Sequence, residues 1–289
     1  YILEVSSFQL EHIISFKPFI SVFLNITPDH LDRYSNMEEY VKAKLNLIKN
    51  QTREDHIIFN LDDVILKNEL KNLKPQVHGF SLEKRNQTIF NVNATKIYSE
   101  GGKKLIDLKD FALIGKHNLL NALAAATASR LIEVSDKHIK SIMTNFQGIE
   151  HRLEYVTEIR GVSYYNDSKA TNLNSVKVAL DSFDNNIYLL MGGQDKGGDF
   201  IDLIPHFKNK VIRIITFGQA SNKISKALRD AVRLIRVKDL KDAVEFCHMN
   251  AASGDIVLLS PGCASFDQFL NFEERGIIFK KLVKEMAEA

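Results

Sequence analysis

The sequence predicts an α/β protein with two domains. Short β-rich runs alternate with helical runs along the chain, which is the pattern of α/β domains. In the second half the alternation is regular, so we expect parallel strands joined by right-handed crossovers in a doubly wound sheet. At 289 residues the chain is long enough for two domains of ordinary size.

The first half is predicted to mix strands and helices. An apolar run at residues 1–5 is typical of a strand already under way, as in an internal fragment of a longer protein. Hydrophobic periodicity then predicts strands at 20–26 and 55–60, a helix at 37–49, several short strands within 77–113, an Ala-rich helix within 115–132 and a helix at 136–146. We expect the domain boundary near Gly148, which gives domains of 1–148 and 149–289.

The second half is predicted to alternate strictly. Strands are expected at 162–166, 187–191, 211–217 and 255–260, with helices near 172–183, 200–208, 221–231, 239–252 and 265–287. The composition, 45% hydrophobic and 26% charged, is that of a soluble globular protein.

Charge and cysteine content exclude several classes of protein. The net charge of +2 is the remainder of 38 basic and 36 acidic residues, so the overall charge argues neither for a nucleic acid nor for an anionic membrane as the partner. No apolar run approaches the roughly 20 residues that span a bilayer, so membrane insertion is not expected. Cys247 and Cys263 are too few for a disulfide framework or a zinc cluster, which fits a reducing compartment.

The most informative motif is Asn166-Asp-Ser-Lys-Ala-Thr-Asn172, a predicted strand-to-helix turn crowded with polar side chains. The run before it suits a strand, and apolar residues after it recur at helical spacing. Open α/β sheets bind ligands beyond the carboxyl ends of their strands, and helix N-termini favour anions. A capped loop without a ligand is the alternative interpretation.

Two residues of the first half stand out as candidate ligands. On the predicted helix 37–49, Lys44 projects onto the apolar face, whereas Lys42 and Lys49 point elsewhere. Such a lysine snorkels, pairs or loses its charge, and a neutral amine can form a carbamate, an oxygen ligand of the kind that Mg²⁺ prefers. His30 follows a predicted strand, in a loop that can present it to a site. The alternative for Lys44 is simple snorkelling of a charged side chain, and the alternative for His30 is an ordinary surface or core histidine.

Glu4 is a third candidate. An acid at the carboxyl end of a strand commonly holds Mg²⁺ in phosphoryl-transfer proteins. The alternative interpretation is that Ser6 or Ser7 caps a helix here, and the two interpretations are compatible. The sequence contains no G-x-x-x-x-G-K-[ST] phosphate loop. No G-x-G-x-x-G follows a predicted strand, which argues against a nicotinamide dehydrogenase.

Two further turns suit an anion. The pair Gly192-Gly193 precedes Lys196 and lets the backbone approach a ligand closely. Ser265 is predicted to open the helix 265–287, whose free N–H groups and positive dipole end suit a carboxylate. The alternative for Gly192-Gly193 is an ordinary turn, and the alternative for Ser265 is an ordinary N-cap without a ligand.

Four motifs together resemble the Mur ligase family of bacterial cell-wall synthesis. They are Asn166–Asn172, Gly115-Lys-His-Asn-Leu-Leu-Asn-Ala122, Thr27-Pro-Asp-His-Leu-Asp-Arg-Tyr34 and Leu258-Leu-Ser-Pro-Gly-Cys-Ala-Ser-Phe-Asp-Gln-Phe269. The resemblance covers the whole chain and is most specific at 166–172, where ligases for other amino acids differ. It implies a partial central ATPase-type α/β domain followed by a Rossmann-like C-terminal domain. A UDP-binding domain and the ATP phosphate loop would lie upstream of Tyr1.

The implied activity is ATP-dependent addition of D-glutamate to UDP-N-acetylmuramoyl-L-alanine through an acyl phosphate. The implied enzyme is cytoplasmic and, when full length, monomeric. Its implied Mg²⁺ ligands are Glu4, His30 and a carbamylated Lys44. Its implied ATP contacts are Asn118 and Asn121 to adenine, Arg152 to the transferred phosphate and Asp167 to the ribose. The implied amino-acid site comprises Lys169, Thr171, Lys196, Ser265, Phe266 and Phe272, and the catalytic set comprises His30, Lys44, Arg152 and Lys169.

One departure and two alternatives stay open. Gln194 stands where some relatives have an acid, so no catalytic role is carried to it. A folylpolyglutamate synthase-like glutamate ligase is one alternative, although a different sequence is expected there at 166–172. A non-catalytic nucleotide- or amino-acid-binding fragment is the other, because the phosphate loop is missing from these residues.

Overall fold

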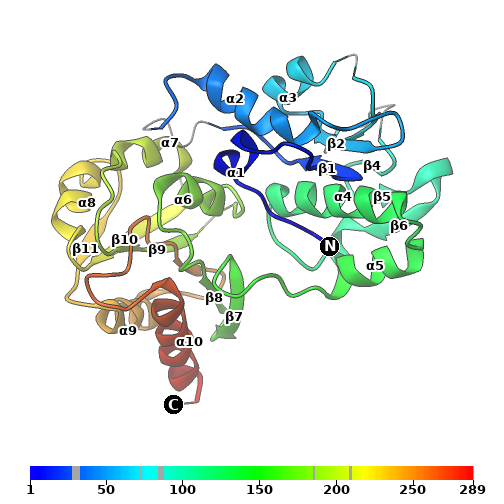
Figure 1. Cartoon of the computed structure of the whole chain (residues 1–289). Helices are drawn as coiled ribbons and strands as arrows, with labels where there is room; N and C mark the ends of the chain where they lie inside the picture. Colours follow the sequence, from blue (N-terminus) through cyan, green and yellow to red (C-terminus); the bar gives the residue numbers. More distant parts are fainter. Residues whose placement is uncertain (28–32, 72, 84–87, 185, 208–209, 289) are drawn as a thin grey trace. The chain divides into compact units, whose positions relative to one another are not determined.

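The computed structural model describes all residues except 28–32, 72, 84–87, 185, 208–209 and 289. The chain divides into two compact units, Tyr1–Phe146 and Gln147–Ala289, each with its own parallel sheet (Figure 1). The predicted α/β fold class is therefore confirmed. Within the described ranges, no helix is both long and apolar enough to cross a membrane.

The first unit is built on a three-stranded parallel sheet ordered β1 (Ile20–Phe23), β2 (His56–Asn60) and β3 (Gln76–Phe80). Side chains of β2 alternate between the two faces, as the period of a strand requires. Ile57 and Phe59 therefore join one hydrophobic core and Ile58 joins the other.

Each of these cores is closed by helices. The core around Ile57 receives side chains from α2 (Met37–Leu45), α3 (Val64–Glu69) and, at its border, α1 (Ser7–Glu11). The core around Ile58 receives them from α4 (Lys116–Leu131), α5 (Asp136–Asn145) and a small antiparallel sheet of β4 (Asn91–Val92), β5 (Lys96–Tyr98) and β6 (Lys104–Asp107). The 3-10 turns are η1 (Asn46–Ile48), η2 (Glu100–Gly102) and η3 (Leu108–Asp110).

Two predictions for this unit need correction, and one short helix was not predicted. Residues 1–5 are not a strand but an exposed or half-exposed segment, because no described strand pairs with them and the helix α1 begins directly afterwards. Ser6 caps that helix with a capping box, which was the alternative interpretation. Strand β1 ends at Phe23, earlier than predicted, and the short α3 was not predicted.

The second unit holds a six-stranded sheet in the order β11-β10-β9-β12-β8-β7. The strands are β7 (Glu154–Ile159), β8 (Val162–Asn166), β9 (Ile187–Gly192), β10 (Val211–Phe217), β11 (Leu234–Arg236) and β12 (Ile256–Leu259). All neighbours pair in parallel except the edge strand β7, which is antiparallel to β8.

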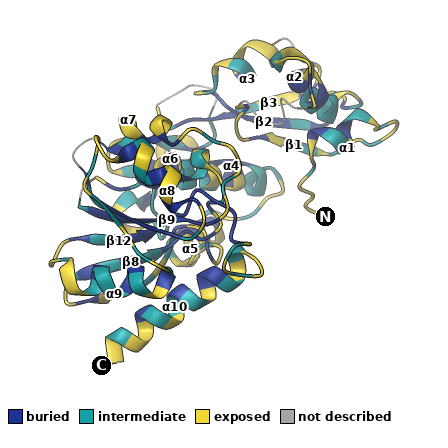
Figure 2. Cartoon of the chain, turned by 90° about the vertical axis from the view of Figure 1, so that its left-hand side faces the viewer, coloured by how far each residue is buried: buried dark blue, intermediate teal, exposed yellow. Residues whose placement is uncertain are grey.

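Helices cover both faces of this sheet, as expected for a doubly wound fold (Figure 2). One face is packed by α9 (Leu240–Asn250) and α10 (Phe272–Glu288), and the other by α6 (Leu173–Leu180), η4 (Phe200–Leu203), α7 (Ile204–Phe207) and α8 (Ser221–Leu228). The chain crosses from β8 to β9 and leaves a position between them that β12 later fills. The carboxyl ends of β8, β12 and β9 are therefore neighbours.

The start of the last helix was predicted wrongly. Helix α10 begins at Phe272 and not at Ser265. The Asn271 side chain accepts the N–H of Glu274 at 2.7 Å, which is the bonding of an N-cap, so the helix can only begin after it. Ser265 instead opens a single turn, its carbonyl accepting the N–H groups of Gln268 and Phe269. Strands β7 and β11 were also missed.

Candidate functional site

The turns that follow β8, β12 and β9 form one cross-linked group of loops. The N–H of Asp167 donates to the carbonyl of Leu259 at 2.8 Å, and the N–H of Gly262 donates to the carbonyl of Ala170 at 2.8 Å. An antiparallel bridge between Gln194 and Ala264 joins the loop after β9 to the loop after β12. Backbone bonds therefore fix these loops at the sheet edge where doubly wound folds bind ligands.

The glycine pair at the end of β9 is required by close backbone contacts. Gly192 and Gly193 have φ of +149° and +127°. A Cβ on Gly192 would lie 2.0 Å from the carbonyl oxygen of Phe217, and one on Gly193 would lie 2.1 Å from that of Ala264. The glycines thus allow the neighbouring loops to approach.

Asp167 is the most perturbed acid of this site. It is 5% exposed, and its Oδ2 accepts from the Ser260 hydroxyl at 2.8 Å while its Oδ1 accepts from the Leu153 N–H at 3.2 Å. Burial raises the pKa of Asp167 to about 7, against the opposing effect of these hydrogen bonds and of Arg152. The carboxyl thus holds the segment 152–153 against the end of β12.

Asn166, at the start of the turn 166–172, lies at the centre of a second cluster of hydrogen-bonded polar side chains. Its Nδ2 donates to the Nδ1 of His151 at 3.0 Å and to the Oε2 of Glu154 at 2.9 Å, and the residue is fully buried. The ammonium of Lys280 pairs with Glu154 at 2.9 Å and also with Glu150. Potential metal-binding atoms of Glu150, His151 and Glu154 lie within 4.8 Å of one another, but Lys280 already supplies positive charge there.

Arg275, on helix α10, hydrogen-bonds to the loops that follow β8, β12 and β9. Its guanidinium donates to the hydroxyl and the carbonyl of Ser168 at 2.9 and 2.8 Å, to the carbonyl of Cys263 at 3.2 Å and to that of Gly192 at 3.5 Å. The residue is 0% exposed, and no carboxylate in the described part of the chain lies within ion-pair distance. Burial lowers the pKa of Arg275 to about 10.

The residues predicted to bind the amino acid lie on these loops in different environments. Lys169 is exposed and its Nζ lies 5.9 Å from the ring centroid of Phe272, which packs edge-on against His151. Thr171 is half-buried, Lys196 is exposed, Ser265 is buried and Phe266 is 67% exposed. The structure shows no hydrogen bond that joins Lys196, Ser265 or Phe266 to Lys169 or Thr171.

Residues predicted to contact ATP or Mg²⁺ are distributed over both units. Arg152 is exposed beside Asp167 in the second unit. In the first unit, Asn118 donates from Nδ2 to the carbonyl of Ile114 at 2.7 Å, and the side chain of Asn121 is exposed on the same helix. Glu4 lies exposed in the segment before α1, and His30 falls outside the described residues.

The helical projection of Lys44 agrees with the structure. Lys44 is half-buried with its Nζ 4.9 Å from the ring centroid of Tyr40, one turn earlier on α2. Lys42 and Lys49 are exposed, as expected for solvated lysines. None of the described carboxylates forms an ion pair with Lys44.

Sequence reasoning missed Arg275, Ser260 and the His151–Asn166–Glu154 cluster. For Arg275 a signal existed, because Phe272, Arg275 and Phe279 recur at i, i+3 and i+7 and so share one helix face. For Ser260 and Asp167 no local pattern could reveal the contact, since 93 positions separate them.

Comparison with known protein families matches both units. The model of the Mur ligase middle domain matches residues 1–129, and that of the Mur ligase glutamate ligase domain matches 151–263. The chain is 42% identical over 287 residues to the UDP-N-acetylmuramoylalanine–D-glutamate ligase of Bacillus cytotoxicus, covering 99% of this chain and 63% of the relative. The ligase of the same name from Bacillus mycoides is 43% identical over 287 residues, with the same coverage.

Solved structures show the same fold at lower identity. MurF ligase from Thermotoga maritima, in complex with ADP, gives a TM-score of 0.66 at 17% identity, covering 94% of this chain and 64% of that one. The UDP-N-acetylmuramate-alanine ligase MurC from the same organism gives 0.67 at 14% identity, covering 97% of this chain and 62% of that one. With both units matched by Mur ligase domains and with identity of about 40% along nearly its full length, the chain belongs to the Mur ligase family.

Proposed function

We propose that the protein to which this chain belongs is an ATP-dependent ligase that adds D-glutamate to UDP-N-acetylmuramoyl-L-alanine. The observation that carries the proposal is the 42% identity, along 99% of this chain, to a ligase of that name. The chain spans 63% of the length of that relative, so the activity belongs to the whole protein and not to these residues alone. The protein is proposed to act in the cytoplasm as a monomer.

The proposed reaction forms an amide in two steps. The alanyl carboxylate attacks the γ-phosphate of ATP, which releases ADP and gives an acyl phosphate. The amine of D-glutamate then attacks the acyl carbon, loses a proton, and inorganic phosphate leaves with the electron pair of the broken C–O bond. Such chemistry depends on positioning and on stabilising negative charge, which fits the cationic groups around the turn 166–172.

In the second unit, the proposed roles follow the loops at the strand ends. Lys169 and Arg152 are both exposed and cationic, so each can face an anionic intermediate. Lys196, Ser265 and Phe266 are proposed to hold the carboxylates of D-glutamate, with Thr171 beside the amine and Phe272 against the carbon chain. Both oxygens of Asp167 already accept internal hydrogen bonds, so any contact with a ribose would use the remaining lone pairs.

In the first unit, Asn118 and Asn121 are proposed to contact adenine. Mg²⁺ is proposed to be held by Glu4, His30 and a carbamate on Lys44. The donor chemistry fits, because a carboxylate and a carbamate both offer the oxygens that Mg²⁺ prefers. When bound, the ion would neutralise phosphate charge.

Binding of D-glutamate to the chain as it stands tests the amino-acid site. We expect D-glutamate to shift the amide resonances of residues 166–172 and 262–272 more than L-glutamate does, with an affinity in the millimolar range. Lys169→Gln should weaken this binding about tenfold, the value of one charge-assisted hydrogen bond. Lys226→Gln, an exposed lysine on α8, is the matched control.

The same titration separates the remaining alternatives. Tighter binding of L-glutamate than of D-glutamate would contradict a D-glutamate site and favour a glutamate ligase that uses the L-isomer, and equal binding would contradict a D-specific site. No binding of either isomer would favour a scaffold without an amino-acid site.

A further inference from the structure

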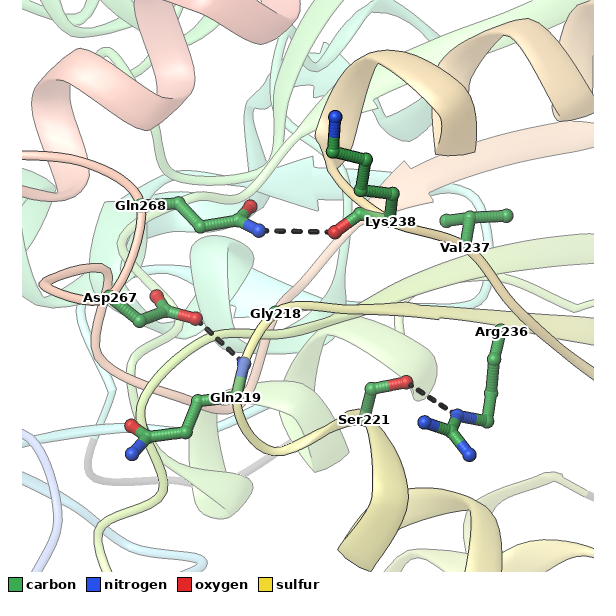
Figure 3. A pocket seen from close by; sticks show the side chains of 8 residues that line it. All are labelled: Gly218, Gln219, Ser221, Arg236, Val237, Lys238, Asp267 and Gln268. Atoms are coloured by element: carbon green, nitrogen blue, oxygen red, sulfur yellow. Dashed lines mark hydrogen bonds between the residues drawn. The ribbon is translucent and has the colours of Figure 1, made fainter.

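A pocket of about 750 Å³ lies beside the carboxyl ends of β10 and β11, and no residue of the turn 166–172 lines it (Figure 3). Gly218 and Gln219 follow β10, Arg236 ends β11, and Lys238 follows it. The opposite wall comes from the loop 265–271. None of the residues assigned above to ATP, Mg²⁺ or the amino acid lines this pocket.

The lining carries more positive than negative charge. Arg236 and Lys238 supply two cations, and Asp267 supplies one carboxylate. The Oδ2 of Asp267 accepts the backbone N–H of Gln219 at 2.8 Å, and its Oδ1 is shielded from solvent. The carboxylate thus ties the turn after β10 to the loop 265–271, while the pocket keeps a net positive charge.

The two cations are arranged differently. The Nε of Arg236 donates to the hydroxyl of Ser221 at 3.3 Å and its Nη1 donates to Asn222 at 2.8 Å, which orients the guanidinium. Its Nη2 has no partner among the described residues. The Nζ of Lys238 likewise has no partner there, although its carbonyl accepts from Gln268 at 3.1 Å (Figure 3).

Neutral donors complete the lining. The side-chain amides of Gln219 and Gln268 border the pocket, whereas the bordering hydroxyl of Ser221 is already hydrogen-bonded to Thr216 at 2.7 Å and to Arg236. Ser221 also begins α8, and no side chain caps this helix, so its first N–H groups add to the positive potential. An oriented guanidinium, an ammonium without a described partner and neutral donors together match a doubly charged oxyanion better than a single carboxylate.

From this arrangement we infer that the pocket binds a small organic molecule through its phosphate group. A volume of about 750 Å³ lies in the range of small-molecule sites and exceeds what one inorganic phosphate needs, so the organic part of the ligand has room. The inference does not rest on the residues proposed for the ligase reaction, although Asp267 and Gln268 share the loop 265–271 with Ser265 and Phe266.

Titration of the full chain tests the inference without ATP or glutamate. Ribose 5-phosphate serves as the probe, with ribose as its uncharged counterpart and inorganic phosphate as the bare ion. We expect ribose 5-phosphate to shift the amide resonances of residues 218–222 and 236–238, inorganic phosphate to bind more weakly, and ribose to leave them unchanged. Arg236→Gln and Lys238→Gln should each weaken binding about tenfold.

Matched controls exclude a general effect of charge. Lys226→Gln and Lys241→Gln remove the same charge from exposed positions on α8 and α9 that do not line the pocket, and should leave the affinity unchanged. The inference would be overturned if ribose 5-phosphate moved no pocket resonance, if ribose moved them equally, if inorganic phosphate bound more tightly, or if the control variants lost as much affinity as the pocket variants.

Discussion

The guanidinium of Arg275 donates from Nε to the hydroxyl of Ser168 at 2.9 Å and from Nη2 to the carbonyl of the same residue at 2.8 Å. This pair ties the last helix of the chain to the turn after β8, in which Lys169 and Thr171 are the proposed amino-acid contacts. All partners of the buried cation are neutral, so it positions loops without neutralising an acid. A buried guanidinium of this kind is maintained by its full set of hydrogen bonds.

Replacing Arg275 should therefore destabilise the second unit strongly. Arg275→Met would leave the Ser168 and Cys263 carbonyls with buried, unpaired oxygens, at a cost of about 3 kcal/mol or more in the free energy of unfolding. Arg275→Lys should recover only part of the loss, because an ammonium cannot reproduce the planar fork. Urea denaturation measures both. Lys281→Met, at an exposed position on the same helix, is the control and should change the free energy of unfolding by less than about 0.5 kcal/mol. An equally small loss of stability for Arg275→Met would refute the positioning role of Arg275.

The raised pKa of Asp167 predicts how stability depends on pH. With a folded-state pKa of about 7, above the value of 3.8 in the unfolded chain, the folded protein binds more protons between these values. The contribution of this group to stability is therefore greatest below about pH 3.8, falls as the pH rises through this window, and is constant above about 7. The total change is about 4 kcal/mol. Asp167→Asn should flatten this slope in urea titrations at pH 5 and 8, and an unaltered slope would contradict the buried-carboxyl interpretation.

Helix α10 also needs a glycine where it approaches the polar cluster. A Cβ on Gly276 would lie 2.2 Å from the Nδ1 of His151, a buried ring that is itself bonded to Asn166. Gly276→Ala should therefore lower the free energy of unfolding by about 1–3 kcal/mol, despite the better helix propensity of alanine. Ile277→Ala, at an exposed neighbouring position, provides the comparison in thermal and urea melts. A stabilised Gly276→Ala variant would show that His151 can move away.

Lys44 offers a test of the proposed carbamate in the whole enzyme. Lys44→Ala should lower turnover roughly 10²-fold, the usual effect of losing one stabilising electrostatic group, and short carboxylic acids added to the buffer should restore part of it. Lys42→Ala, two residues away, removes an exposed lysine that pairs with Glu38 and should retain full activity. Unchanged turnover in Lys44→Ala would end the carbamate proposal.

The sequence was sufficient for those elements whose pattern is local. Strands β2, β8, β9 and β12 are runs of apolar residues bounded by turn signals, and their positions follow from that pattern. Strand β7 was not predicted because it lies at the edge of the sheet and most of its residues are only partly buried or exposed, so it lacks a clear apolar run. The start of α10 was misplaced because Ser265 has the composition of an N-cap, whereas the Asn271 side chain performs that function.

The candidate site could be proposed from the sequence where a motif gathers its residues within a few positions. The turn 166–172 was found in this way, and its location after β8 and before α6 agrees with the prediction. The contacts that hold it in place were not, because Ser260, Cys263 and Arg275 reach it from distant parts of the chain. Such pairings depend on sheet order, which strand patterns alone do not fix.

The most direct test of the proposed activity uses the whole protein, with the upstream coding sequence included. Phosphate release is measured with ATP, Mg²⁺ and UDP-N-acetylmuramoyl-L-alanine in the presence of either D-glutamate or L-glutamate. We predict release that depends on the D-isomer and falls sharply in Lys169→Gln. Release that is absent with both isomers, or equal with both, would contradict the assignment of this chain to a D-glutamate ligase.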